Sequence, residues 1–260
     1  MSRVWLLTSV FGFNMSITRW KLTFEFDGTD FKGWQRQKPG TRTVQGVIED
    51  SFFSLYQKNI AIAGQGRTDS GVHALQQTAH ADLPDTFEHD RILRAINSIL
   101  PGDVALLSAV KTDFNFHARF NAIARRYQYR IITRQSPLQR HYAWYVPGDI
   151  EEEKLHYCAD LIMGENDFIN FCKPPQDKYL TTLCTIKTSR WKKLDQGFVF
   201  EIEGNRFLRH LVRRLVGTMV QVSQHEISTQ EFEDLLKPEE KEKKGHSAPP
   251  HGLVLKSVSY

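Results

Sequence analysis

Hydrophobic and polar residues alternate along residues 20–26. Trp20, Leu22, Phe24 and Phe26 are separated by Lys, Thr and Glu, and a glycine follows Asp27. A period of two residues is typical of a half-buried β-strand. Together with further apolar runs bounded by turn residues, this pattern predicts strands at residues 20–26, 60–63, 76–83, 104–111, 123–133, 183–191, 198–203 and 253–260.

Apolar residues that recur at helical spacing predict helices between these strands. In residues 43–56, Val44, Val47, Ile48 and Phe52 lie on one face of a helix. The same spacing predicts helices at residues 92–100, 152–163, 206–222 and 229–236.

The order of strands and helices before residue 115 is roughly repeated after it. It predicts an α+β fold made of two similar α/β domains, residues 15–115 and 116–260, with mainly antiparallel sheets flanked by helices. Two such domains would place an active-site cleft between them.

Composition is that of an ordinary globular protein, but the basic residues are unevenly distributed. The 260 residues are 40% hydrophobic and 25% charged, with a net charge of +4. Residues 111–140 hold seven Lys and Arg against one acid, Asp113. A locally basic surface on a nearly neutral protein favours a polyanionic partner.

The three cysteines, Cys158, Cys172 and Cys184, include no Cys-x-x-Cys pair. They favour neither a zinc site nor a disulfide framework, so we expect buried thiols in a cytoplasmic protein. Residues 1–14 contain a short apolar run that cannot span a membrane. We expect a disordered extension there and no association with a membrane.

Candidate chemistry begins at Asp69, in the sequence Gly66-Arg67-Thr68-Asp69-Ser70-Gly71. A carboxylate on a glycine turn after a predicted strand is either an ordinary solvated side chain or a catalytic group held rigidly. The stretch is neither a P-loop nor a dinucleotide fingerprint, because the required Lys and third glycine are absent. A carboxylate would also repel phosphates, which favours chemistry on a sugar or a base.

The predicted helix at residues 206–222 carries a second feature. Its apolar stripe predicts core packing, and its opposite face is basic without an acid to pair with. That face is either a solvated surface or a contact with phosphate or carboxylate groups; its members are Arg206, Arg209, His210, Arg213 and Arg214.

The predicted strand at residues 123–133 alternates arginines with tyrosines. Arg125, Tyr127 and Tyr129 point to one side and Arg126 to the other. Such a strand can stack bases and hold phosphates, although tyrosines also occur in the cores of sheets. His73 has no third ligand near it in sequence, so no metal site is predicted.

These segments, in this order, resemble the TruA family of tRNA pseudouridine synthases. The resemblance extends from about residue 15 to residue 260 and rests on residues 27–37, 66–74, 125–129, 204–213 and 248–253. Two positions depart from the family pattern: Ser70 stands where alanine is common, and Cys184 stands where we expect an arginine.

The resemblance implies a homodimeric enzyme that isomerises uridines 38, 39 and 40 of the tRNA anticodon stem-loop without a cofactor or metal. Asp69 would be the catalytic nucleophile or base, Tyr127 would stack on the target base, and Arg213 would pair with Asp69. Arg67, on the same turn as Asp69, is assigned to substrate binding. RNA contacts are expected from Arg125, Arg126, Arg206 and Arg209. The alternatives are a synthase acting on other tRNA positions and a non-catalytic tRNA-binding module.

Overall fold

The structure is a computed structural model that describes residues 16–85, 89–173, 181–239 and 243–260. The predicted extension at residues 1–14 lies outside these ranges. The strands are β1 (Ile17–Phe26), β2 (Ala63–Gly64), β3 (His73–Pro84), β4 (Val104–Thr112), β5 (Ala124–Ile132), β6 (Trp144–Tyr145), β7 (Gly164–Asp167), β8 (Leu183–Leu194), β9 (Gly197–Gly204) and β10 (Leu253–Ser259). The helices are α1 (Val44–Tyr56), α2 (His89–Asn97), α3 (Glu152–Leu161), α4 (Leu211–Ser223) and α5 (Thr229–Leu235), with short 3-10 turns η1 (Ile169–Phe171) and η2 (Pro250–Gly252).

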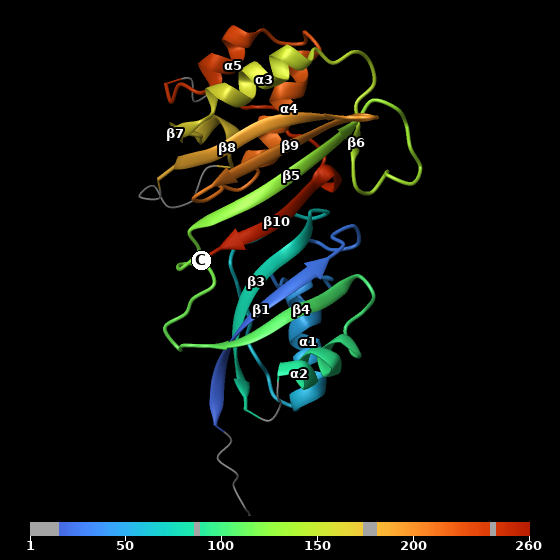
Figure 1. Cartoon of the computed structure of the whole chain (residues 1–260), viewed down its shortest axis with the longest axis vertical. Coiled ribbons are helices and arrows are strands. Elements are labelled where there is room, and N and C mark those ends of the chain that lie inside the picture. Colours follow the sequence, from blue (N-terminus) through green and yellow to red (C-terminus); the bar gives the residue numbers. More distant parts are fainter. Residues whose placement is uncertain (1–15, 86–88, 174–180, 240–242) are drawn as a thin grey trace, which may run out of the picture.

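The ten strands formed by the described residues belong to one sheet, whose main path runs β4-β1-β3-β10-β5-β9-β8-β7. Neighbours on this path are antiparallel except β10 and β3. Helices α1 and α2 lie with the N-terminal strands, whereas α3, α4 and α5 gather on the C-terminal ones (Figure 1). The predicted α+β class with a mainly antiparallel sheet is confirmed.

The last strand joins the two halves of the sheet. β10 lies between β3 and β5 (Figure 1), where Leu255 pairs with Ala74 on one side and with Tyr127 on the other. The strand that follows Asp69 and the strand that carries Tyr127 are therefore separated by a single strand. The insertion of β10 thus sets the spacing between the strand after Asp69 and the strand of Tyr127.

The alternating pattern in β1 corresponds to its burial. Trp20, Leu22, Phe24 and Phe26 are all buried, as the period of two residues predicts. Helix α1 begins after Thr43, whose hydroxyl accepts a hydrogen bond from the amide of Gly46. A capped helix start and a buried strand face are local features, so the sequence pattern reports them well.

Two predicted elements are corrected by the structure. Helix α4 begins at Leu211 and not at residue 206, because His210 adopts a left-handed conformation with φ of 70° that a continuous helix cannot contain. Arg206 and Arg209 therefore precede the helix and do not share its outer face. The strand predicted at residues 60–63 is reduced to β2, which pairs with β3 over two residues.

Candidate active site

Asp69 lies at the start of a tight turn that leads into β3. The amide of Val72 donates a hydrogen bond to the Asp69 carbonyl over 3.2 Å, and Gly71 has a φ of +78°. A side chain at residue 71 would be strained in this conformation, so glycine is required there. The hydroxyl of Ser70 donates to the carbonyl of Phe31, which ties the turn to the loop after β1.

The loop after β1 packs directly against the turn that carries Asp69. The amide of Trp34 donates to the carbonyl of Thr68 over 3.2 Å. Gly33 has a φ of +90°, and a Cβ atom there would lie 2.7 Å from the Thr68 carbonyl oxygen. The ring of Trp34 is buried against Gly64. The backbone that carries Asp69 is thus held by close packing, as a catalytic side chain requires.

The Asp69 carboxylate faces three nitrogen-bearing side chains of the C-terminal half. Oδ2 lies 3.4 Å from Arg213 Nη1 and 3.6 Å from His210 Nε2, and Oδ1 lies 3.9 Å from Arg209 Nε. Tight charge-assisted hydrogen bonds are about 2.7–2.9 Å long. The carboxylate, 23% exposed, therefore faces two guanidinium groups and one imidazole without a short ion pair to any of them, and its oxygens can still engage a substrate.

Arg213 lies in the first turn of α4 and is only 17% exposed. Its Nε donates to the carbonyl of Ala248 over 2.8 Å while Nη1 points to Asp69. Because both donors belong to one rigid plane, the hydrogen bond to Ala248 fixes the orientation in which the guanidinium faces Asp69. Residues 248–252 also receive a hydrogen bond from the Tyr129 hydroxyl, at the carbonyl of Pro249.

His210 was not among the predicted site residues. It is the N-cap residue of α4, and its left-handed backbone turns the imidazole toward Asp69. Burial lowers the pKa of His210; the nearby Arg213 and Arg209 lower it further, and Asp69 opposes them. The burial and the two arginines favour the neutral imidazole. In the sequence, His210 belongs to the basic face that is either solvated or in contact with phosphate or carboxylate groups, but no pattern there pairs it with Asp69.

Tyr127 is buried in β5, with 9% of its surface exposed. Its ring packs edge-on against Phe207, with ring centroids 5.2 Å apart. Burial raises the pKa of Tyr127 to about 12, and the negative charge of Asp69 acts in the same direction. The phenol therefore keeps its proton at neutral pH.

The remaining predicted arginines differ in exposure and in their partners. Arg67 and Arg209 are exposed, and the Nε of Arg67 donates to Gln35; Arg206 is half-buried. Arg126 forms an ion pair with Glu203 on the neighbouring strand β9. The Arg125 guanidinium donates to the carbonyls of residues 119, 122 and 205, so its visible role is structural.

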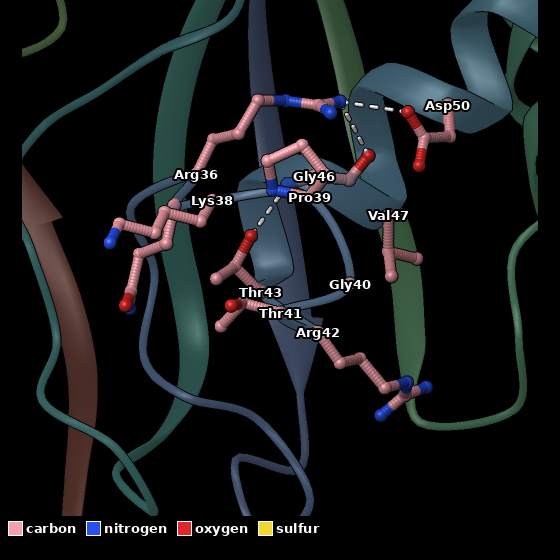
Figure 2. Close-up of a pocket in the computed structure, with 11 residues that line it drawn as sticks. Arg36, Lys38, Pro39, Gly40, Thr41, Arg42, Thr43, Gly46, Val47 and Asp50 are labelled. Atoms are coloured by element: carbon pink, nitrogen blue, oxygen red, sulfur yellow. Dashed lines mark hydrogen bonds and ion pairs between the residues drawn. The ribbon is translucent and has the colours of Figure 1, made fainter.

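A separate cavity of about 290 Å³ lies at the start of α1 and contains none of the predicted site residues (Figure 2). In it, the guanidinium of Arg36 reaches the carbonyl of Gly46 and the carboxylate of Asp50. Arg42 is paired with Asp103. The arginines of this cavity are already neutralised, so we assign no anion to it.

Other kinds of site can be assessed within the described ranges. There, no three His, Cys, Asp or Glu side chains are grouped as metal ligands. No helix in the same ranges is long and apolar enough to cross a membrane. The three cysteines are buried as free thiols, as predicted.

Comparison with known proteins identifies the class that this fold and site define. A family model described as tRNA pseudouridine synthase matches residues 22–121 and 158–260. The chain is 37% identical over 247 residues to tRNA pseudouridine synthase A of Bacillus pumilus, covering 92% of this chain and 98% of the relative. It is 36% identical to the proteins of the same name from Ehrlichia chaffeensis and Bacillus subtilis, each over 93% of this chain and at least 99% of the relative.

The chain therefore belongs to the TruA family of tRNA pseudouridine synthases. Enzymes of this family are isomerases.

Proposed function

We propose that this protein converts uridines 38, 39 and 40 of the tRNA anticodon stem-loop to pseudouridine, with Asp69 as the group that acts on the sugar. The observation that carries the proposal is the arrangement around Asp69. A single carboxylate stands on a rigid turn and faces Arg213 from the other half of the sheet at 3.4 Å. Such a site suits an ionised carboxylate that must stay reactive.

The reaction is an isomerisation. The bond between N1 of uracil and C1′ of ribose breaks, the uracil turns, and C5 bonds to the same C1′ while the hydrogen on C5 leaves as a proton. Asp69 serves this sequence in either of two ways. As a nucleophile it forms an ester at C1′ as the N1–C1′ bond breaks, and C5 later displaces the carboxylate. As a base it takes the proton from C2′ as the N1–C1′ bond breaks, and it returns that proton to C2′ when C5 bonds to C1′. Neither route gains or loses electrons overall.

The neighbouring residues suit the remaining steps. A paired or stacked uridine must be turned out of the RNA before Asp69 can reach its sugar. Tyr127 would then stack on the displaced base. Arg213 orients the carboxylate, and the exposed Arg67 and Arg209 contact phosphates near the target.

The wider organisation follows from the family. The protein would work as a cytoplasmic homodimer, with tRNA crossing both subunits. Residues 15–115 and 116–260 would form its two domains, and the site would lie in a cleft between them. The contacts between the turn at Asp69 and residues 209–213 support this position.

The test is to map pseudouridine in unmodified tRNA transcripts that carry single uridines at chosen positions, after incubation with the purified protein. Modification at 38, 39 and 40 supports the proposal. Modification elsewhere in the tRNA indicates a synthase of different specificity. Binding of the transcripts without any modification indicates a non-catalytic tRNA-binding module.

A further inference from the structure

One segment of the chain, residues 246–252, contacts both helix α4 and the turn that carries Asp69; we call it the strap. On the helix side, the Ala248 amide donates to the Arg213 carbonyl over 3.0 Å, and the Ala248 carbonyl accepts from Arg213 Nε over 2.8 Å. A Cβ atom at Gly217 would lie 2.4 Å from the carbonyl oxygen of His246, so glycine is required for this close approach. The strap is thus joined to the residue that faces Asp69.

The strap also contacts the turn of Asp69 and the start of β3. A Cβ atom at Gly71 would lie 3.0 Å from Pro250 Cγ, so the turn packs directly on the proline ring. Two residues further on, His73 Nε2 lies 3.2 Å from the carbonyl oxygen of His251. Because a carbonyl only accepts hydrogen bonds, Nε2 carries a proton and is the donor.

The ring of His73 is itself held in one orientation. It is buried, with 5% of the residue exposed, and its Nδ1 accepts a hydrogen bond from the Gly28 amide over 3.0 Å. Asp27 Oδ1, 3.0 Å from the same nitrogen, accepts from the amide and the hydroxyl of Thr29. The Tyr142 ring packs against the imidazole, with ring centroids 5.1 Å apart. A buried ring with a partner at each nitrogen is a firm anchor for the strap.

We propose that His73 is a positioning residue, which fixes the strap on the turn and thereby sets the orientation of the Arg213 guanidinium toward Asp69. The inference rests on the proposed function, in which Asp69 acts on the sugar. Arg213 is bound to the strap over 2.8 Å and stands 3.4 Å from Asp69, so a displaced strap would move the guanidinium. Small errors in the placement of reacting groups slow a chemical step strongly, whereas RNA affinity depends mainly on phosphate contacts.

The experiment compares His73→Asn and His73→Gln in single-turnover reactions with tRNA. The side-chain amide of Gln can donate to the His251 carbonyl in place of Nε2, whereas the shorter Asn can replace only Nδ1. We expect His73→Asn to slow the reaction about fivefold or more, the effect of one ordinary hydrogen bond on a rate. His73→Gln should retain at least about a third of the wild-type rate, and both variants should change the Kd for tRNA less than about twofold.

His80→Asn is the matched control. His80 is a second buried histidine of β3, and its Nδ1 also accepts from a backbone amide, that of Ala118. The same loss of ring volume occurs there without a contact to the strap in any hydrogen bond of the described residues. His80→Asn should therefore react within about twofold of wild type.

A double-mutant cycle tests whether His73 acts through Arg213. In an Arg213→Lys background, which lacks the planar guanidinium, His73→Asn should slow the reaction less than about twofold. Pro250→Ala removes the Cγ atom that packs on Gly71; it should show the same dependence on Arg213, and it decides the question if His73→Asn does not fold. An equal loss in both backgrounds, or equal rates for His73→Asn and His73→Gln, would overturn the proposal and leave His73 as a structural partner of Gly28. Absence of turnover in the wild type would instead refute the proposed function.

Discussion

Replacing Arg213 by lysine tests how Asp69 is oriented. Arg213 donates from Nε to Ala248 and from Nη1 toward Asp69, so its two contacts come from two nitrogens of one plane. Lysine keeps the positive charge but has a single nitrogen at the end of a flexible chain. It can replace one of these contacts in its present geometry and loses the other.

The structure sets the size of the effect. A hydrogen bond to a charged group contributes about 1.5–3 kcal/mol, and each 1.36 kcal/mol in the activation free energy changes a rate tenfold. Arg213 is mostly buried, so water replaces the lost contact poorly. We therefore expect Arg213→Lys to slow the chemical step roughly 10- to 150-fold.

Arg214→Lys is the matched control. Arg214 donates from Nη1 to the carbonyl of Cys172 over 2.8 Å, a contact that lysine can make. Its Nε is buried without a hydrogen-bond partner within the described residues, so its loss costs little. Single-turnover rates at saturating enzyme, with tRNA affinity measured in parallel, compare the two variants. If Arg214→Lys proved the more damaging, our assignment of Arg213 to Asp69 would be wrong.

Three further predictions concern the same site. Asp69→Asn should abolish turnover while tRNA binding survives; residual turnover above about a tenth of wild type would remove Asp69 from catalysis. Tyr127→Phe should keep measurable activity and Tyr127→Ala should lose far more, because stacking contributes about 1–3 kcal/mol per base; equal losses would point to the hydroxyl instead. Arg209→Gln should reduce the slope of log affinity against log salt by about one, whereas Arg126→Gln should change it less, because Arg126 is paired with Glu203; identical slopes for both would contradict this division.

Local sequence patterns predicted most of the elements, because burial repeats at the period of each element. Trp20 and Phe24 are buried in β1 as their alternation indicates. The same reasoning failed at residues 206–210. Phe207 and Leu211 stand at helical spacing, but the left-handed backbone of His210 starts the helix afresh at Leu211. A spacing pattern does not report one residue with an unusual φ.

The candidate site is assembled by contacts that no local pattern contains. Asp69 and Arg213 are 144 positions apart in sequence, and their pairing depends on β10, which enters the sheet between β3 and β5. Only the family resemblance placed these two residues together in advance. The contact between His210 and Asp69 depends on this same long-range arrangement.

Release of tritium from tRNA labelled at C5 of its uridines tests the central claim most directly. Formation of the new bond at C5 expels that hydrogen to water, so the assay follows the isomerisation itself. The purified protein should release tritium without any added cofactor, with an equal yield of pseudouridine, and Asp69→Asn should release none. Wild-type protein that binds the labelled tRNA and releases no tritium would contradict the claim that this chain is a pseudouridine-forming enzyme.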